Sequence, residues 1–290
     1  MKNFSSTVYT TDDAKSGYTY SIINNEAAIT GFSGEPTYIN IPEIIDGCRV
    51  TEIKENSFYN CLTLKHIDIP ETVEKIGHHA FYACLSLENI VIPDSVTEIG
   101  MGSFCGCDSL RSVSLPENLT EIPDSCFRSC TSLTNIIIPQ NIERIGEFCF
   151  SGCTSLMAVS IGDNTKSLDD CSFYMCSSLK NLYIPDSVEK IGSCAVGYIP
   201  TPEGSMTMDG FIVLGSKKSV AKKYADENNL TFEDVGNSLH AFAVQRINGQ
   251  RITVPSVFVA GVAILFVSAL FMTFSKTHNA KKNRKRKIKK

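Results

Sequence analysis

The 290-residue sequence lacks the short motifs on which catalysis and nucleotide binding usually depend. It contains no phosphate-binding loop, no nucleophile elbow and no distinct paired-carboxylate motif. Histidine is scarce, and His78-His79 is the one adjacent pair among five. Because no second ligand cluster recurs beside this pair, we interpret it as exposed polar side chains on an outer turn. We therefore expect no catalytic residue, no metal site and no cofactor, so that an enzyme is the disfavoured class.

Basic charge is scarce outside the last fifteen residues. Residues 276–290 hold nine Lys or Arg and no acid, whereas residues 1–275 hold 18 basic and 31 acidic side chains, a net charge of −13. An acidic body is poorly suited to binding a phosphate backbone, which excludes nucleic acid as its expected partner. The apolar fraction of 43% and the charged fraction of 20% are typical of an ordered protein.

Charge is absent altogether from residues 252–275, ITVPSVFVAGVAILFVSALFMTFS. A helix of this length reaches roughly 36 Å, enough for a hydrocarbon core of about 30 Å. A buried helix in a soluble domain is the alternative, but such helices rarely stay apolar on all sides for so long. We predict one C-terminal transmembrane helix over 252–275, after a linker over 237–251 and before a basic cytoplasmic tail over 276–290.

The start of the sequence lacks the apolar segment of a secretory signal peptide, and residues 1–17 are predicted to be a flexible N-terminus. The positive-inside rule nevertheless places the basic tail in the cytoplasm and residues 1–251 outside. The opposite orientation would require nine positive charges to cross the membrane. Two explanations stay open: the true start lies upstream of Met1, or export uses no conventional signal.

The body of the chain repeats itself every 23 residues. LKHIDIPETVEKIGHHAFYACLS (64–86) is followed by LENIVIPDSVTEIGMGSFCGCDS (87–109) and by four further units that end at residue 201. An earlier unit begins at Ile41 and carries the insertion EIIDGCR after Pro42. A Leu-rich period of this length is typical of a solenoid of stacked, horseshoe-type coils. We predict about seven units over 41–201.

Within each unit, LxxIxIP alternates apolar and polar residues as a short strand does, and Pro ends the strand. A short helical turn on the far side is expected to carry a large buried Phe, and Gly77, Gly100, Gly146 and Gly192 suit a tight bend. The fifth full unit departs most, with Gly162, Thr165 and Asp169 at the usual Pro, Val and Gly positions. The Phe column consists of Phe58, Phe81, Phe104, Phe127, Phe150 and Phe173, and a Cys column consists of Cys61, Cys84, Cys107, Cys130, Cys153 and Cys176.

The Cys column admits packing, disulfide, metal or redox interpretations. In-register side chains of neighbouring coils lie about 4.8 Å apart with parallel Cα–Cβ bonds, whereas a disulfide needs converging Cβ atoms about 3.8 Å apart. Zinc needs four thiolates around one centre, which a straight row does not supply. Packing is favoured, with the other readings kept as alternatives. Cys126 and Cys149 lie in a column that Ala80 and Ala195 also occupy, so they are interpreted as small core residues.

The consensus LxxIxIPxSVxxIGxxAFxxC resembles the BspA-like, or treponemal-type, leucine-rich repeat family, and the resemblance covers residues 18–235. It implies a leucine-rich-repeat solenoid, α/β-type, with short strands and helical or 3-10 turns. It also implies an N-terminal cap over 18–40 and a strand–helix–strand cap over 202–236, around GFIVLGSKKSVAKKYADENNLTFEDV. Members are typically surface or secreted proteins of host-associated microbes, and some are adhesins, which implies cell-surface adhesion here. No Leu-Pro-x-Thr-Gly signal precedes the uncharged run, so sortase anchoring is not expected.

The outward residues of the strands form the candidate binding face. Asn, Ser and a few exposed apolar groups on a rigid sheet suit a protein or glycan ligand. The alternative is a solvated surface without a ligand, in a structural spacer or scaffold. One predicted column contains His66, Asn89, Ser112, Asn135, Ala158 and Asn181, and the other contains Asp68, Val91, Ser114, Ile137, Ser160 and Tyr183.

Overall fold

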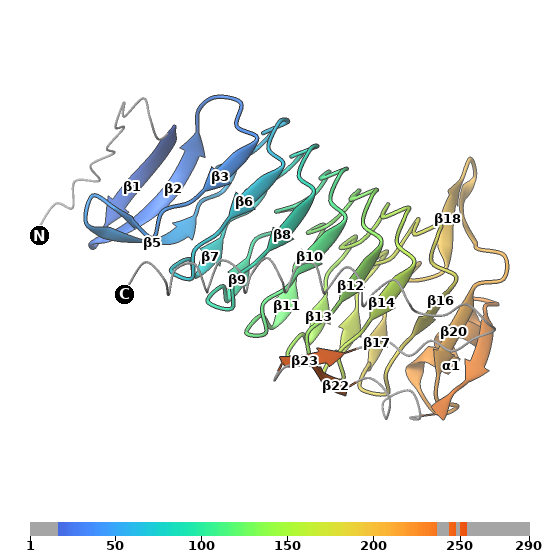
Figure 1. Ribbon diagram of the computed structural model, residues 1–290. Helices are drawn as coiled ribbons and strands as arrows, with labels where there is room; N and C mark the ends of the chain where they lie inside the picture. Colours follow the sequence, from blue (N-terminus) through green and yellow to red (C-terminus); the bar gives the residue numbers. More distant parts are fainter. Residues whose placement is uncertain (1–16, 237–243, 248–249, 254–290) are drawn as a thin grey trace, which may run out of the picture. The chain divides into compact units, whose positions relative to one another are not determined.

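The computed structural model describes residues 17–236, 244–247 and 250–253. The chain divides into two compact units, residues 1–241 and 242–290. The first unit is a stack of coils that begins at β1 and ends at β20 and α1 (Figure 1). This stack confirms the predicted leucine-rich-repeat solenoid.

Each coil contributes one strand to each of two rows. The first row contains β3 (Tyr38–Asn40), β6 (His66–Asp68), β8 (Asn89–Val91), β10 (Ser112–Ser114), β12 (Asn135–Ile137), β14 (Ala158–Ser160) and β16 (Asn181–Tyr183). The second row contains β5 (Cys48–Ile53) and the two-residue strands β7 (Lys75–Ile76), β9 (Glu98–Ile99), β11 (Glu121–Ile122), β13 (Arg144–Ile145), β15 (Ser167–Leu168) and β17 (Lys190–Ile191). Pairing between coils is parallel and in register, as where Asn89 lies beside Ser112.

Both ends of the stack are closed by additional elements. At the N-terminal end, β1 (Tyr18–Ile23) pairs antiparallel with β2 (Glu26–Phe32), β2 pairs parallel with β5, and β4 (Ile44–Ile45) folds back on β5 within the inserted segment. At the other end, the hairpin of β18 (Tyr198–Thr201) and β19 (Gly204–Thr207) precedes β20 (Ile212–Gly215), α1 (Val220–Glu227) and β21 (Thr231–Asp234). The Ser219 hydroxyl caps α1 by accepting a hydrogen bond from the main-chain N–H of Lys222.

The strand pairing of the second row is interrupted between β9 and β11, because one main-chain donor is missing there. Gly77 and Gly100 each donate a main-chain N–H to the preceding coil, at 2.7 Å from the oxygens of Ile53 and Ile76. Pro123 occupies the equivalent position and has no N–H to donate. The strands therefore form two separate groups in this row, β5–β7–β9 and β11–β13–β15–β17.

The Phe column is the centre of the core. All six rings are at most 1% exposed, and successive rings stack with centroids 5.1–5.5 Å apart. The rings are nearly parallel, with interplanar angles of 3–10°. No coil buries its Phe alone, so the stack of coils is the unit that folds.

The far side of each coil is built of successive turns, which corrects the expected helical or 3-10 turns. In one coil, the main-chain N–H of Ser57 donates to the carbonyl of Lys54, and that of Cys61 donates to the carbonyl of Phe58. The third residues of these two turns are Asn56 and Asn60, which have φ of 57° and 58°. Positive φ at the third residue is the mark of a type II turn and is incompatible with a helix. Within the described residues, α1 is the one α-helix.

The regular recurrence of Gly77 and Gly100 in the repeat has a different cause from the bend expected above. Neither residue has a positive φ. A Cβ at Gly77 would lie 2.4 Å from the Glu55 nitrogen, and one at Gly100 would lie 2.4 Å from the His78 nitrogen. These glycines therefore permit close approach of consecutive coils.

The divergent fifth unit has its own stabilising contacts. Thr165 is fully buried, and its hydroxyl donates to the Ile142 carbonyl at 3.0 Å. Asp169 accepts a hydrogen bond at 2.7 Å from Arg144, which also reaches Glu121 and Asp124. One guanidinium thus links three consecutive coils.

Several sequence predictions fall wholly or partly outside the described residues. These are the flexible N-terminus predicted over 1–17, of which only residue 17 is described, the cytoplasmic tail predicted over 276–290, and the predicted span from residue 254 onward. The predicted linker 237–251 overlaps an antiparallel pair, β22 (Val244–Ile247) and β23 (Gln250–Thr253), so Ile252 and Thr253 lie in a strand. Among the residues that the structure describes, no helix has the length and apolarity needed to span a bilayer.

Candidate functional site: the outer face of the first strand row

The predicted site residues lie together on the outer face of the first strand row, called the strand face below. Asn89 lies beside Ser112 and Val91 beside Ser114, while Asn135 lies beside Ala158 and Ile137 beside Ser160. Figure 1 shows β6 and β16 in the same row of strands. His66 and Asp68 flank buried Ile67 on β6, and Asn181 and Tyr183 flank buried Leu182 on β16, so all four lie on the outer face. Residues between them, such as Ile67, Ile90 and Ile136, are buried, so the face is supported directly by the core.

The two columns of the strand face consist mostly of uncharged polar side chains, many of them half-buried Asn and Ser. His66, Asp68, Val91 and Ser114 are exposed, and Val91 has 49% of its surface accessible. Ser112 donates its hydroxyl to Asn89 Oδ1 at 2.6 Å, which couples two neighbouring coils. The face ends at β16, because Leu214, which lies beside Tyr183, is 2% exposed. Burial, with Asp186 and Asp163 nearby, raises the pKa of the Tyr183 hydroxyl.

The structure adds Tyr38 and Asn40 of β3, which sequence reasoning missed. Tyr38 lies beside His66 and Asn40 beside Asp68. The Tyr38 hydroxyl donates to Asp68 Oδ2 at 2.6 Å, and this bond, with partial desolvation and the Asp68 charge, raises the pKa of Tyr38 to about 12. The inserted segment shifts β3 out of the 23-residue spacing. Nevertheless, YINIP (38–42) has the same form as HIDIP (66–70), and that signal was available.

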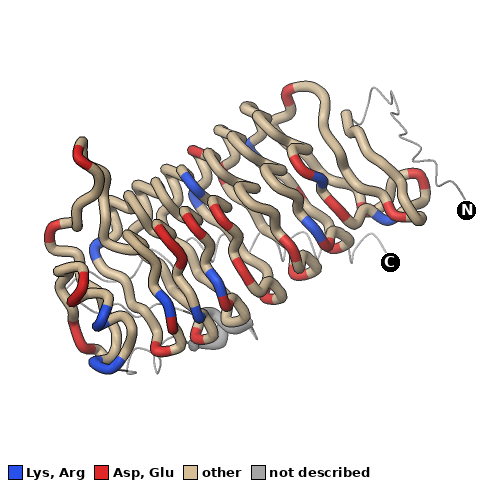
Figure 2. The backbone as a smooth tube through the Cα atoms, turned by 180° about the vertical axis from the view of Figure 1, so that it is seen from behind, with Lys and Arg blue, Asp and Glu red and all other residues tan. Residues whose placement is uncertain are grey.

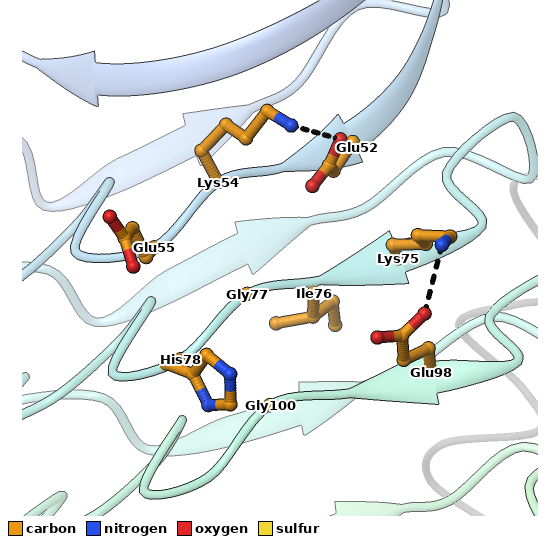
Figure 3. A pocket seen from close by; sticks show the side chains of 9 residues that line it. All are labelled: Glu52, Lys54, Glu55, Lys75, Ile76, Gly77, His78, Glu98 and Gly100. Atoms are coloured by element: carbon orange, nitrogen blue, oxygen red, sulfur yellow. Dashed lines mark hydrogen bonds and ion pairs between the residues drawn. The ribbon is translucent and has the colours of Figure 1, made fainter.

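A second concave region lies on the second strand row and has a volume of about 330 Å³. Glu52, Lys54, Glu55, Lys75, Ile76, Gly77, His78, Glu98 and Gly100 line it (Figure 3). Lys54 pairs with Glu52 at 2.5 Å and Lys75 pairs with Glu98 at 2.9 Å, so both cations are already neutralised. Figure 2 shows acidic residues recurring from coil to coil with fewer basic ones among them. This region is therefore poorly suited to an anionic ligand.

The two adjacent histidines have structural partners. His78 Nδ1 accepts the main-chain N–H of Met101 at 2.9 Å. His79 lies edge-on to Tyr82 with ring centroids 5.6 Å apart, and it packs over Gly102, where a Cβ would lie 2.7 Å from the imidazole. Within the described part of the chain, no group of three or more His, Cys, Asp or Glu is placed to hold a metal ion.

All twelve cysteines are free, and five of the six in the Cys column are buried. Each of these five donates its thiol hydrogen to a Phe carbonyl of the preceding coil, with Sγ 3.1–3.2 Å from the oxygen. Burial raises the pKa of Cys176 to about 12 and that of the half-buried Cys61 to about 11. Protonated thiols are poor nucleophiles and poor metal ligands, which gives the column a packing role.

Comparisons with known proteins agree with this geometry. The model of the family described as BspA type leucine rich repeat region matches residues 36–134 and 120–199, with six copies. No curated protein matches the chain.

Solved structures with the same architecture come from bacteria. A leucine rich cell surface protein from Faecalibacterium prausnitzii is 27% identical, with a TM-score of 0.58 over 70% of this chain and 61% of that one. The chain therefore spans about three fifths of that protein's length. A leucine rich repeat protein of T. pallidum is 26% identical, with a TM-score of 0.55 over 75% of this chain and 95% of that one.

Proposed function

Because the chain belongs to the BspA-type leucine-rich repeat family, we propose that it is a non-enzymatic binding protein whose strand face contacts a protein or glycan at the cell surface. The observation that carries this proposal is the strand face itself. Its two columns present Asn, Ser and exposed Val91 on a sheet that a continuous core holds rigid. Such a preorganised surface loses little conformational entropy when it binds.

The description of the F. prausnitzii relative as a cell surface protein supports this location. The uncharged run at 252–275 and the basic residues at 276–290 support a single membrane anchor with a cytoplasmic tail. In this arrangement the repeats lie outside the cell and the strand face is available for adhesion.

The proposal is tested with the full chain displayed on a non-adherent bacterium and immobilised mucin or extracellular-matrix protein as the probe. Val91→Arg places a long charged side chain on the strand face. Leu62→Arg is the matched control in the turn before β6, outside the two outward columns, because Val91 and Leu62 are 49% and 51% exposed. We expect Val91→Arg to reduce adhesion at least tenfold and Leu62→Arg to leave it unchanged. Equal adhesion by all three chains, or none by the unaltered chain, would instead favour a structural spacer or scaffold.

A further inference from the structure

We infer that the N-terminal end of the strand face binds a neutral glycan, with the Tyr38 ring as the platform on which a sugar ring stacks. This inference rests on the proposed function of the strand face and specifies its ligand. The site consists of Tyr38 on β3, His66 and Asp68 on β6, Asn89 on β8 and Ser112 on β10.

Tyr38 combines exposure with a fixed orientation. The residue is 53% exposed, yet its hydroxyl is held by Asp68 at 2.6 Å, from a strand that lies beside its own. A ring fixed at both ends loses little rotational freedom when a ligand covers it. The negative face of an aromatic ring attracts the C–H groups on one side of a sugar ring, because those hydrogens carry partial positive charge.

Tyr59, on the far side of the coils, shows why exposure alone does not make such a platform. It is 47% exposed, but its ring stacks on Tyr82 with centroids 4.9 Å apart and planes 5° apart. One face of Tyr59 is therefore occupied. Among the ring contacts of the described residues, none covers Tyr38.

The side chains on the coils that follow Tyr38 and His66 along the face match a ligand with many hydroxyl groups. Asn89 provides both a donor and an acceptor, and its Oδ1 is oriented by the Ser112 hydroxyl at 2.6 Å. Successive coils present such groups about 4.8 Å apart, so a linear ligand that crosses the strands meets polar groups coil after coil.

Charge selects a neutral ligand at this end of the face. The outward columns of β3, β6, β8 and β10 contain no Lys or Arg, and Asp68 adds a negative charge. Exposed Lys65 and Arg111 precede β6 and β10 but lie outside these columns. Within the columns a sulfated or carboxylated glycan would meet no Lys or Arg and would be repelled by Asp68. Trp and Arg, which dominate the energetic centres of protein interfaces, are also absent from these columns.

The test measures binding of the full chain to mannan, laminarin and xylan as neutral polysaccharides and to heparin as an anionic one, by affinity electrophoresis and calorimetry. We expect at least one neutral polysaccharide to bind and heparin to bind at least tenfold more weakly. Tyr38→Ala should lower the affinity at least tenfold, whereas Tyr38→Phe, which keeps the ring but loses the bond to Asp68, should lower it by a smaller factor. Tyr59→Ala should leave the affinity unchanged. Ser112→Arg, which leaves Tyr38 in place, should also lower it.

Three outcomes would overturn the inference: binding of heparin alone, no binding of any neutral polysaccharide, or equal binding by the Tyr38→Ala and Tyr59→Ala chains. If Val91→Arg abolishes adhesion to a protein while no neutral polysaccharide binds, the proposed function stands and the glycan inference fails. If no strand-face substitution alters any binding, both fail.

Discussion

Cys130 donates its thiol hydrogen to the main-chain carbonyl of Phe104, with Sγ 3.2 Å from the oxygen in the preceding coil. The same relationship joins Cys107 to Phe81 and Cys153 to Phe127. A thiol at this position fills a small buried volume and gives a weak donor to a buried carbonyl, which an alanine would not. The recurrence of Cys every 23 residues thus follows from packing and hydrogen bonding together.

Replacing Cys130 with Ala should lower the free energy of unfolding by about 1–2 kcal/mol, because it removes a buried atom and its hydrogen bond. Urea denaturation under reducing conditions measures the change. Cys105→Ala is the control, because Cys105 is only half-buried and should change stability by no more than about 0.5 kcal/mol. If both substitutions lowered the free energy of unfolding equally, the Cys column would have no stabilising role beyond that of other cysteines.

Replacing Phe104 with Ala should cost about 3–5 kcal/mol, since the ring is fully buried between Phe81 and Phe127. Met101 belongs to the same coil and is 43% exposed, so Met101→Ala should be nearly neutral. Thermal and urea unfolding of both variants would check the contrast. A nearly neutral Phe104→Ala would contradict the placement of the Phe column at the centre of the core.

Replacing Gly106 with Ala should cost about 1 kcal/mol, the left-handed backbone penalty less the entropy that glycine loses on folding. Gly106 has φ of 73°, and the nearest atom to an added Cβ lies at 3.7 Å, so strain rather than collision is responsible. Ala83 occupies the equivalent position one coil earlier with φ of 55°. Ala83→Gly should therefore raise the midpoint of urea unfolding, and a lowered midpoint would contradict the turn geometry.

The buried thiols predict a loss of stability at alkaline pH. Burial raises the pKa of Cys176 from 9.0 to about 12, so the thiol ionises in the unfolded chain before it does in the folded one. Its stabilising contribution is complete below pH 9 and is lost as the pH rises toward about 12. The stability difference between the unaltered chain and Cys176→Ala should therefore shrink between pH 8 and pH 11. The stability difference between the unaltered chain and Leu179→Ala should stay constant over the same pH range. If both differences declined in parallel, ionisation of the Cys176 thiol would not be the cause.

The sequence predicted the parts of the fold that depend on alternation and period. Ile90 and Ile136 lie inward with Asn89 and Asn135 outward, because LxxIxIP fixes which strand residues face the core. The Phe column is equally regular. These features need only side-chain type at a repeated spacing.

The sequence could not predict the features that depend on backbone conformation or on contacts between coils. His79, Phe148 and Cys171 have positive φ at turn positions that usually favour Gly or Asn, so their identities conceal the turns. The thiol–carbonyl contacts join residues 26 positions apart, and the Tyr38–Asp68 bond spans 30. Pro123 was visible as a departure from Gly, but its effect on strand pairing follows only from the hydrogen bonds around it.

The orientation of the repeats relative to the membrane is the most direct test of the account, because adhesion requires them outside. An epitope inserted at Gly34, an exposed position where a Cβ would meet nothing within 4 Å, reports on the repeats, and a second epitope after Lys290 reports on the tail. Protease added to intact cells should remove the first epitope and spare the second, while permeabilised cells should lose both. Protection of the Gly34 epitope in intact cells would contradict the adhesin proposal and would indicate a cytoplasmic scaffold instead.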